Sequence, residues 1–307
     1  MSDLARHADD YLTLRRALGF KLVNTGRFLP QLVSYLEAAG AKTLTVDLAI
    51  AWARQLPRGK RAISMAHRLG AARGFARYLR AIDPETEVPP RGIWTSDTRR
   101  PVPYLYSDDD MRRLLEATQQ LRPRLRAATH EALFGLLAAS GMRIGEARRL
   151  ERDDVDLADG VLTIRESKFD RSRLVPLHPS AVDALRAYAA ERDRLCPRPK
   201  TAAFFVSSVG TALGYSGVLK TFNELTAAIG LRSATVRPRI HDLRHSFAVR
   251  TIIELHRSGA DVGAHVAVLS TYLGHVNPAG TYWYLSAAPE LMELAAARLD
   301  GRFGGRS

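Results

Sequence analysis

Apolar residues recur at helical spacing through the first third of the chain. Between residues 26 and 39 they include Leu29, Leu32 and Leu36, which share one face when the segment is helical. Gly40 stands where a helix commonly ends in a left-handed residue. The pattern predicts four helices, at about residues 4–18, 26–39, 46–56 and 60–82.

The remaining two-thirds combines helical spacing with two short runs of strand character. Ser107, with Asp110 three residues later, has the form of a helix N-cap. The runs VLTIRE and RLVPL read as strands, joined by a short polar connection that contains Lys168. We therefore expect a mainly α protein with a small antiparallel β-sheet. Helices are predicted near residues 107–120, 125–140, 179–194, 216–229, 241–257, 262–273, 278–286 and 289–298.

A proline-rich stretch separates these two parts. It contains Pro84, Pro89, Pro90, Pro101 and Pro103, a composition typical of an irregular linker. The predicted organisation is a helical domain at residues 1–98, a linker at 99–106 and a second domain at 107–307.

The chain is strongly basic, with a formal net charge of +13 and an isoelectric point near 10.3. Lysine and arginine displace counterions from a phosphate backbone, so this charge favours nucleic acid as the partner over an acidic membrane. The predicted helix at 60–82 has one apolar face and one cationic face, and could lie along DNA. A solvated surface helix is the alternative. The candidate DNA-binding side chains are Arg61, Arg68, Arg73, Arg77 and Arg80.

Composition also limits the location of the protein. One cysteine, Cys196, excludes an internal disulfide, and no apolar run reaches the roughly 18 residues needed to cross a bilayer. No signal-peptide pattern opens the chain. We expect a cytoplasmic protein with no membrane partner.

Six side chains of the second domain form the candidate active site. The sequence shows no paired carboxylates, no metal-ligand cluster and no glycine-rich loop that would bind phosphate. It does offer basic side chains together with a tyrosine nucleophile. This combination indicates chemistry on an anion, most simply a DNA phosphate. Arginine suits this task because its planar fork binds two phosphate oxygens and stays ionised. The candidates are Arg143, Lys168, His241, Arg244, His275 and Tyr284.

Local spacing supports several of these candidates. Arg143 follows a glycine break, and Glu146 lies three residues later, where it can pair with the arginine and orient it. His241 and Arg244 are three apart, so both can point into one pocket from the start of a helix. Gly274 is expected to end a helix just before His275.

Two tyrosines compete for the role of nucleophile. Tyr282 and Tyr284 are two residues apart, about 200° around a helix, so they cannot face the same pocket. One is expected to react and the other to pack, and spacing alone leaves the choice open.

Together these motifs resemble the tyrosine recombinase, or phage integrase, family over about residues 103–290. The arginine box is ASGMRIGEARRL, the histidine-x-x-arginine box is HDLRHSF, and LGH ends at His275, nine residues before Tyr284. The lysine before the VPL segment falls on Lys168, although Ser167 stands where the family commonly has glycine, which leaves Arg171 and Arg173 as alternative cations.

The resemblance implies a mechanism and an assembly. Tyr284 would attack a scissile phosphate to give a 3′-phosphotyrosyl link and a free 5′-hydroxyl, with Arg143, Arg244 and His275 bracing the phosphate. Lys168 would protonate the leaving oxygen, and His241 would help to remove the phenol proton. The covalent link conserves the bond energy, so no ATP, metal or other cofactor is expected.

The resemblance also implies how the protein meets DNA. The first domain would be a core-binding domain that clamps double-stranded DNA together with the catalytic domain. Family members act as homotetramers on paired sites, sometimes with an accessory recombinase or DNA-bending protein. We expect a recombinase of a mobile element, with an Xer-type resolvase of replicon dimers as the alternative.

Three further readings remain open from the sequence. A type IB topoisomerase shares the tyrosine and cation chemistry but would relax a duplex without pairing two sites. A DNA-binding protein without catalysis is a second alternative. A metal hydrolase using His241, His245 and His275 is a third, since His-x-x-x-His on a helix is a zinc spacing.

Overall fold

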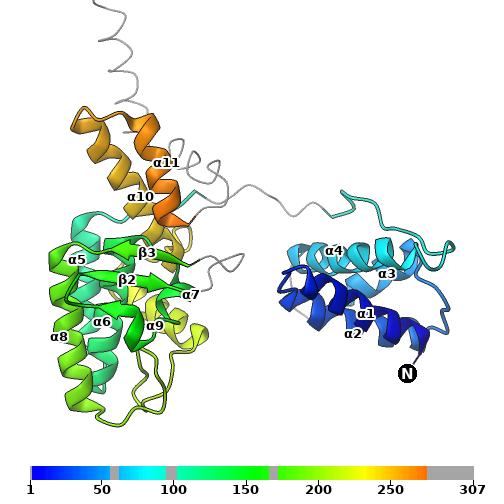
Figure 1. The fold of residues 1–307 in the computed structure, drawn as a ribbon, viewed down its shortest axis with the longest axis horizontal. Coiled ribbons are helices and arrows are strands. Elements are labelled where there is room, and N and C mark those ends of the chain that lie inside the picture. The colour runs from blue at the N-terminus through cyan, green and yellow to red at the C-terminus, as the bar shows by residue number, and fades with distance from the viewer. Residues whose placement is uncertain (1, 56–61, 95–101, 166–171, 275–307) are drawn as a thin grey trace, which may run out of the picture. The chain divides into compact units, whose positions relative to one another are not determined.

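The computed structural model describes residues 2–55, 62–94, 102–165 and 172–274. The chain divides into two compact units, Met1–Pro101 and Val102–Ser307, and each is described here by itself (Figure 1). The expected class is confirmed, because the described residues are mostly helical and contain one small antiparallel sheet. The helices predicted at 278–286 and 289–298 lie outside the described residues.

The first unit is helical, and its helices follow the predicted spacing. Their apolar faces meet in one core, in which Leu29, Leu32, Trp52 and Phe75 are almost fully enclosed. Ser2 and Thr45 cap the first and third helices by accepting a hydrogen bond from a backbone N–H. The helices are α1 (Asp3–Ala17), α2 (Val23–Ala38), α3 (Val46–Arg54) and α4 (Ala62–Leu79).

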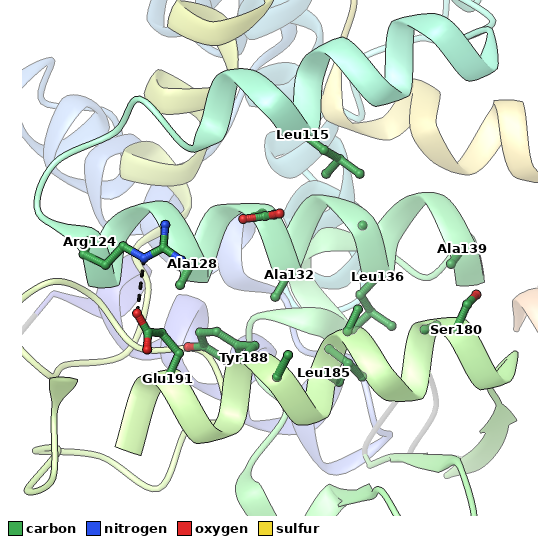
Figure 2. A pocket seen from close by; sticks show the side chains of 15 residues that line it. Leu115, Arg124, Ala128, Ala132, Leu136, Ala139, Ser180, Leu185, Tyr188 and Glu191 are labelled. Carbon is green, nitrogen blue, oxygen red and sulfur yellow. Dashed lines mark hydrogen bonds and ion pairs between the residues drawn. The ribbon is translucent and has the colours of Figure 1, made fainter. Parts of the chain in front are cut away.

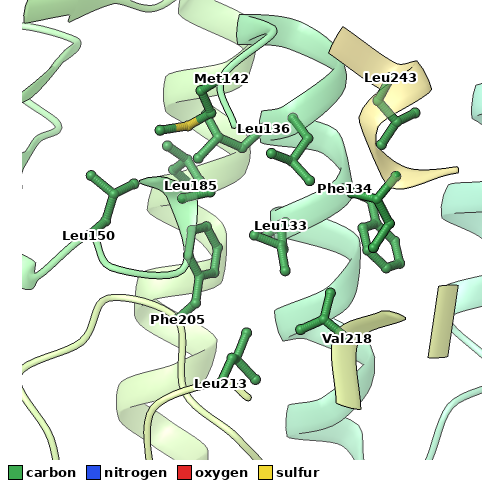
Figure 3. Packing of buried hydrophobic residues seen from close by; sticks show 14 of the residues in the cluster. Leu133, Phe134, Leu136, Met142, Leu150, Leu185, Phe205, Leu213, Val218 and Leu243 are labelled. Carbon is green, nitrogen blue, oxygen red and sulfur yellow. The ribbon is translucent and has the colours of Figure 1, made fainter. Parts of the chain in front are cut away.

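The second unit is built around α6, whose buried residues occupy most of its circumference. Leu133, Phe134 and Leu136 pack there against Leu185 of α8 and against Phe205 (Figure 3). The predicted N-cap is confirmed, because the Ser107 hydroxyl accepts from the Asp110 backbone N–H. The helices are α5 (Asp108–Thr118), α6 (Arg124–Ser140), α7 (Ile144–Ala147), α8 (Pro179–Leu195), α9 (Tyr215–Ala228), α10 (Ile240–Arg257) and α11 (Val262–Leu273).

A three-stranded antiparallel sheet in the order β1-β2-β3 completes this unit. Leu162, Ile164 and Val175 are buried, so one face of the sheet joins the core. The register places Arg173, the first residue of β3, opposite Ile164, the last residue of β2. The strands are β1 (Val155–Asp156), β2 (Val161–Ile164) and β3 (Arg173–Pro176). Of these, β1 was not predicted, because two residues carry too little alternation to detect.

The last two described helices form a smaller core of their own. Val249 and Ile252 of α10 pack against Leu269 and Leu273 of α11. The end of α11 also approaches β3. Segments about 100 residues apart in sequence, such as Arg173 and Tyr272, therefore meet at the C-terminal end of α11. No helix in the described part of the chain has the length and apolar character that crossing a bilayer requires.

Candidate active site

Arg143 lies at the junction between α6 and α7. Gly141 ends α6 in the left-handed conformation, with φ of 59°, and an added Cβ there would clash with the ring of Phe247. The chain then turns so that Arg143 becomes the N-cap residue of α7. Its side chain is 36% exposed, so it borders solvent while remaining anchored to the protein.

Glu146 anchors Arg143, as its spacing predicts. The Glu146 carboxylate accepts from the Arg143 backbone N–H at 2.9 Å and from Nη1 at 2.8 Å. It also accepts two hydrogen bonds from Arg173, at 3.2 and 2.9 Å. Burial alone would raise the pKa of Glu146, but the hydrogen bonds and charges of Arg173 and Arg143 outweigh it and hold the pKa at about 2. Glu146 is therefore a permanent anion between two cations.

Arg244 occupies the interior of the same region. It lies on the first turns of α10 and is 2% exposed. Its Nη1 donates to the Gly141 carbonyl and its Nη2 to the Leu273 carbonyl, each at 2.8 Å. Arg244 therefore links the turn before Arg143 to the end of α11.

Three arginines from three elements meet at the C-terminus of α11. Arg173 donates to the Tyr272 carbonyl at 3.0 Å, Arg244 to Leu273, and Arg143 to Gly274 at 2.9 Å. The last carbonyls of a helix have no partner within it and carry partial negative charge, so cations are favourable there. Gly274 ends the helix in the left-handed conformation with φ of 67°, which confirms the predicted terminator.

His241 lies in the first turn of α10, beside these cations. The residue is exposed, and its ring contacts that of His245 edge-to-face, with centroids 4.7 Å apart. Packing of protein atoms around the ring, and then the charges of Arg244, Arg239 and Arg143, lower the pKa of His241 below its ordinary value. A neutral imidazole at neutral pH can accept a proton.

The metal reading finds no support in the described residues. No group of three His, Cys, Asp or Glu side chains is placed there to hold a metal ion. His241 and His245 lie on one helix next to an arginine, which disfavours a cation between them.

Several predicted site residues lie outside the described part of the chain. They are Arg61, Lys168, His275 and Tyr284, together with the alternatives Arg171 and Tyr282. Arg173, the other alternative to Lys168, is described. It is 13% exposed and bound to both Glu146 and the Tyr272 carbonyl, so it is already engaged within the protein. The sequence offered one signal for this role, its position at the start of a strand.

The described arginines of α4 lie in different surroundings. Arg68 is 7% exposed, donates to the Trp52 carbonyl at 3.0 Å and lies over the Trp52 ring. Arg73 donates to the carbonyls of Pro89 and Pro90, both at 2.7 Å. Both arginines hold the first unit together, and the structure encloses the Arg68 side chain within that unit.

Arg77 and Arg80 remain candidates for DNA contact. Both side chains are exposed. Arg73 is close enough to Arg77 and Arg91 for their charges, after burial, to lower its pKa. A group of like charges that repel one another is stabilised when a polyanion binds.

A separate hollow of about 480 Å³ lies between α6 and α8 (Figure 2). Its walls are mainly small and apolar side chains, and an ion pair between Arg124 and Glu191 lies at one end. Of the predicted site residues that the structure describes, none lines it. The described candidate residues Arg143 and Arg244 therefore meet at the end of α11 and not in this hollow.

Comparison with known proteins covers nearly the whole chain. The model of the phage integrase family matches residues 105–290. A Sinorhizobium fredii protein named as an integrase/recombinase, y4rB, is 43% identical over 100% of both chains. The tyrosine recombinase XerC of Pelotomaculum thermopropionicum is 29% identical over 75% of this chain and 72% of its own.

A solved structure shows the same fold at low sequence identity. The Tn1549 transposon integrase in complex with transposon right end DNA is 17% identical, with a TM-score of 0.68, over 97% of this chain and 99% of that one. The fold therefore extends over both units.

Proposed function

The chain belongs to the phage integrase family and is a tyrosine-type site-specific recombinase, and from this premise we propose that Tyr284 cuts and rejoins DNA. The Tyr284 hydroxyl attacks the scissile phosphorus, its proton leaves, and the bond to the 5′-oxygen breaks. The products are a 3′-phosphotyrosyl link and a free 5′-hydroxyl. A 5′-hydroxyl from the partner site then reverses these steps and completes strand exchange.

The convergence of Arg143, Arg244 and the end of α11 carries this proposal. Negative charge grows on the non-bridging oxygens as the tyrosine attacks, and preorganised cations stabilise that charge. Arg143 borders solvent and uses two of its five N–H donors on the side chains and carbonyls of described residues. Arg244 supplies charge from inside the protein, where a low dielectric makes it act strongly.

Acid–base roles complete the mechanism. His241 accepts the phenol proton, which fits an imidazole whose pKa is lowered by packing and nearby cations. Lys168 protonates the leaving 5′-oxygen, and His275 donates a hydrogen bond to the phosphate. Because the phosphotyrosyl bond stores the energy of the broken bond, no step of the proposal uses ATP or a metal ion.

The first unit is proposed to be the core-binding domain. Its exposed Arg77 and Arg80 contact phosphates of double-stranded DNA and supply affinity without reading bases. Recombination of two duplexes requires four cutting subunits, so a homotetramer is the expected working form, with an accessory recombinase or DNA-bending protein as a further partner. The setting would be the cytoplasm.

Mobile-element transfer is the proposed biological role. Its support is the likeness to y4rB over the full length of both chains and to a transposon integrase in fold. The likeness to XerC keeps resolution of replicon dimers as the second candidate.

Covalent trapping tests the chemistry. The full chain is incubated in EDTA with nicked duplex fragments pooled from the source replicon, and adducts that survive denaturation are isolated. Wild type and Tyr282→Phe are expected to form an adduct whose nucleotide maps to Tyr284, while Tyr284→Phe forms none. An adduct in Tyr284→Phe would move the nucleophile, and salt-sensitive binding without any adduct would favour a non-catalytic protein. Relaxation of supercoils without strand exchange would favour a topoisomerase.

A further inference from the structure

Arg173 connects β3 with α7 and with the end of α11, whose relative positions matter for the proposed reaction. It begins β3, where pairing with Ile164 fixes its backbone. Its guanidinium binds both oxygens of Glu146 and, through Nε, the Tyr272 carbonyl of α11. The planar fork of arginine is suited to such a bidentate contact, and lysine cannot reproduce it.

Gly274 shows how closely this guanidinium packs against the end of α11. A Cβ built on Gly274 would lie 2.9 Å from Arg173 Nη1 and 3.0 Å from Cζ. The guanidinium therefore lies directly against the backbone of the residue whose carbonyl binds Arg143. Movement of Arg173 would disturb the carboxylate and the carbonyl that orient Arg143.

The charges of Glu146, Arg143 and Arg173 explain why a second arginine beside Glu146 is useful. Glu146 carries one negative charge and is shared by two guanidinium groups, so the group of three keeps a net positive charge. Without Arg173, Arg143 would be the main partner of a buried carboxylate and would be drawn further toward it. A phosphate would then meet a cation whose charge is largely neutralised.

We propose that Arg173 is a positioning residue for the recombination reaction, which holds Glu146 and the end of α11 so that Arg143 faces the scissile phosphate. This rests on the proposed function, since Arg143 needs that orientation only if it binds the phosphate. Arg173 is thus a part of the active site that touches no reacting atom. It is distinct from the acid that protonates the leaving oxygen.

Arg192 provides a matched control. It is 3% exposed, binds both oxygens of Asp193 at 2.9 and 3.2 Å and donates to the Phe204 carbonyl at 2.9 Å. This is the same pattern of two bonds to a carboxylate and one to a carbonyl, but on α8. The full-length variants to compare are Arg173→Gln, Arg173→Lys and Arg192→Gln.

The first readout is the rate of adduct formation on the nicked duplex recovered by covalent trapping. Both Arg173 variants are expected to cleave at least about 10-fold more slowly than Arg192→Gln, with DNA affinity within about twofold of wild type. Failure of Arg173→Lys to restore the rate would show that geometry, and not charge alone, is required. Cleavage by both Arg173 variants within about twofold of Arg192→Gln would overturn the proposal.

A second readout requires no DNA. The protein is labelled with ¹³C at the side-chain carboxyl of every glutamate and followed by NMR. The resonance that is missing from the spectrum of Glu146→Gln is assigned to Glu146. In wild type this resonance should stay constant between about pH 4 and pH 8, and in Arg173→Gln it should titrate within that range. Arg143, Arg149 and the Asp154–Arg165 pair also face Glu146 and are unchanged in these variants.

The two readouts separate failure of this proposal from failure of the proposed function. If wild type forms no adduct on any fragment, the recombinase chemistry fails, while the carboxyl resonance still reports whether Arg173 holds Glu146. A Glu146 resonance that is unchanged in Arg173→Gln would refute the coupling whatever the DNA assays show.

Discussion

Substitution of Arg68 by methionine should weaken the first unit without changing its affinity for DNA. Methionine keeps much of the length of the side chain and fills the space beside the Trp52 ring. It removes the hydrogen bond from Nη2 to the Trp52 carbonyl and the contact between the cation and the ring, whose centroid lies 4.1 Å away. Both interactions lie in the core of this unit.

The structure sets the size of the effect. Loss of the hydrogen bond should cost about 1 kcal/mol, because the Trp52 carbonyl still accepts from the Gln55 N–H at 3.1 Å. Loss of the cation–π contact should cost about 1 kcal/mol more. Burial lowers the pKa of Arg68, so the charged form is disfavoured there and methionine recovers part of this loss. The expected net destabilisation is about 1–2 kcal/mol.

Urea denaturation followed by tryptophan fluorescence measures this change, since Trp52 reports from the core of the unit. The midpoint should fall by roughly 1 M with little change in slope. Binding to a duplex of unrelated sequence is then measured over a range of salt concentrations. Arg68→Met should keep the wild-type dependence on salt.

Arg77→Met is the control on the exposed side of the same helix. It should leave the urea midpoint unchanged and reduce the slope of log affinity against log salt by about 1, the value for one lost phosphate contact. The opposite pattern, with a normal midpoint and a reduced salt slope in Arg68→Met, would refute the structural role given to Arg68.

Two further changes test the cluster at the end of α11. Gly274→Ala should slow adduct formation by about 10-fold or more, because alanine is strained at φ of 67° and its Cβ would displace Arg173. Cleavage at the wild-type rate would show that the close packing of Arg173 on Gly274 is unimportant for the reaction. Glu146→Gln should lower stability at pH 7 by on the order of 3 kcal/mol, since the folded pKa of about 2 lies below the ordinary 4.5. This contribution to stability is present above about pH 4.5 and is lost as the pH falls toward 2. The free energies of unfolding of wild type and variant, measured in urea, should therefore converge in acid. A difference in free energy that does not change with pH would contradict an ionised Glu146.

Much of the local structure follows from short-range sequence patterns. The predicted helices at 262–273 and 179–194 match α11 and α8 to within one residue, because spacing of apolar residues and end signals such as Gly274 are local. The pairing of Arg143 with Glu146 was predicted for the same reason, since three residues span about one turn. Two-residue β1 was not predicted, because so short a strand depends on contacts made by the folded chain.

The family and the mainly helical class follow from the sequence alone, and the sequence also supplies the candidate residues for the chemistry, since all of these depend on residue types and their order. The surroundings of the described candidates could be read only from the folded chain. Arg68 and Arg77 lie nine residues apart on one helix, yet the first is enclosed by Trp52 and the second is exposed. Arg173 stood in the sequence as a rival to Lys168 and proves to bind Glu146 and α11. Burial and long-range hydrogen bonds depend on which distant segments meet, and spacing along the chain carries no record of that.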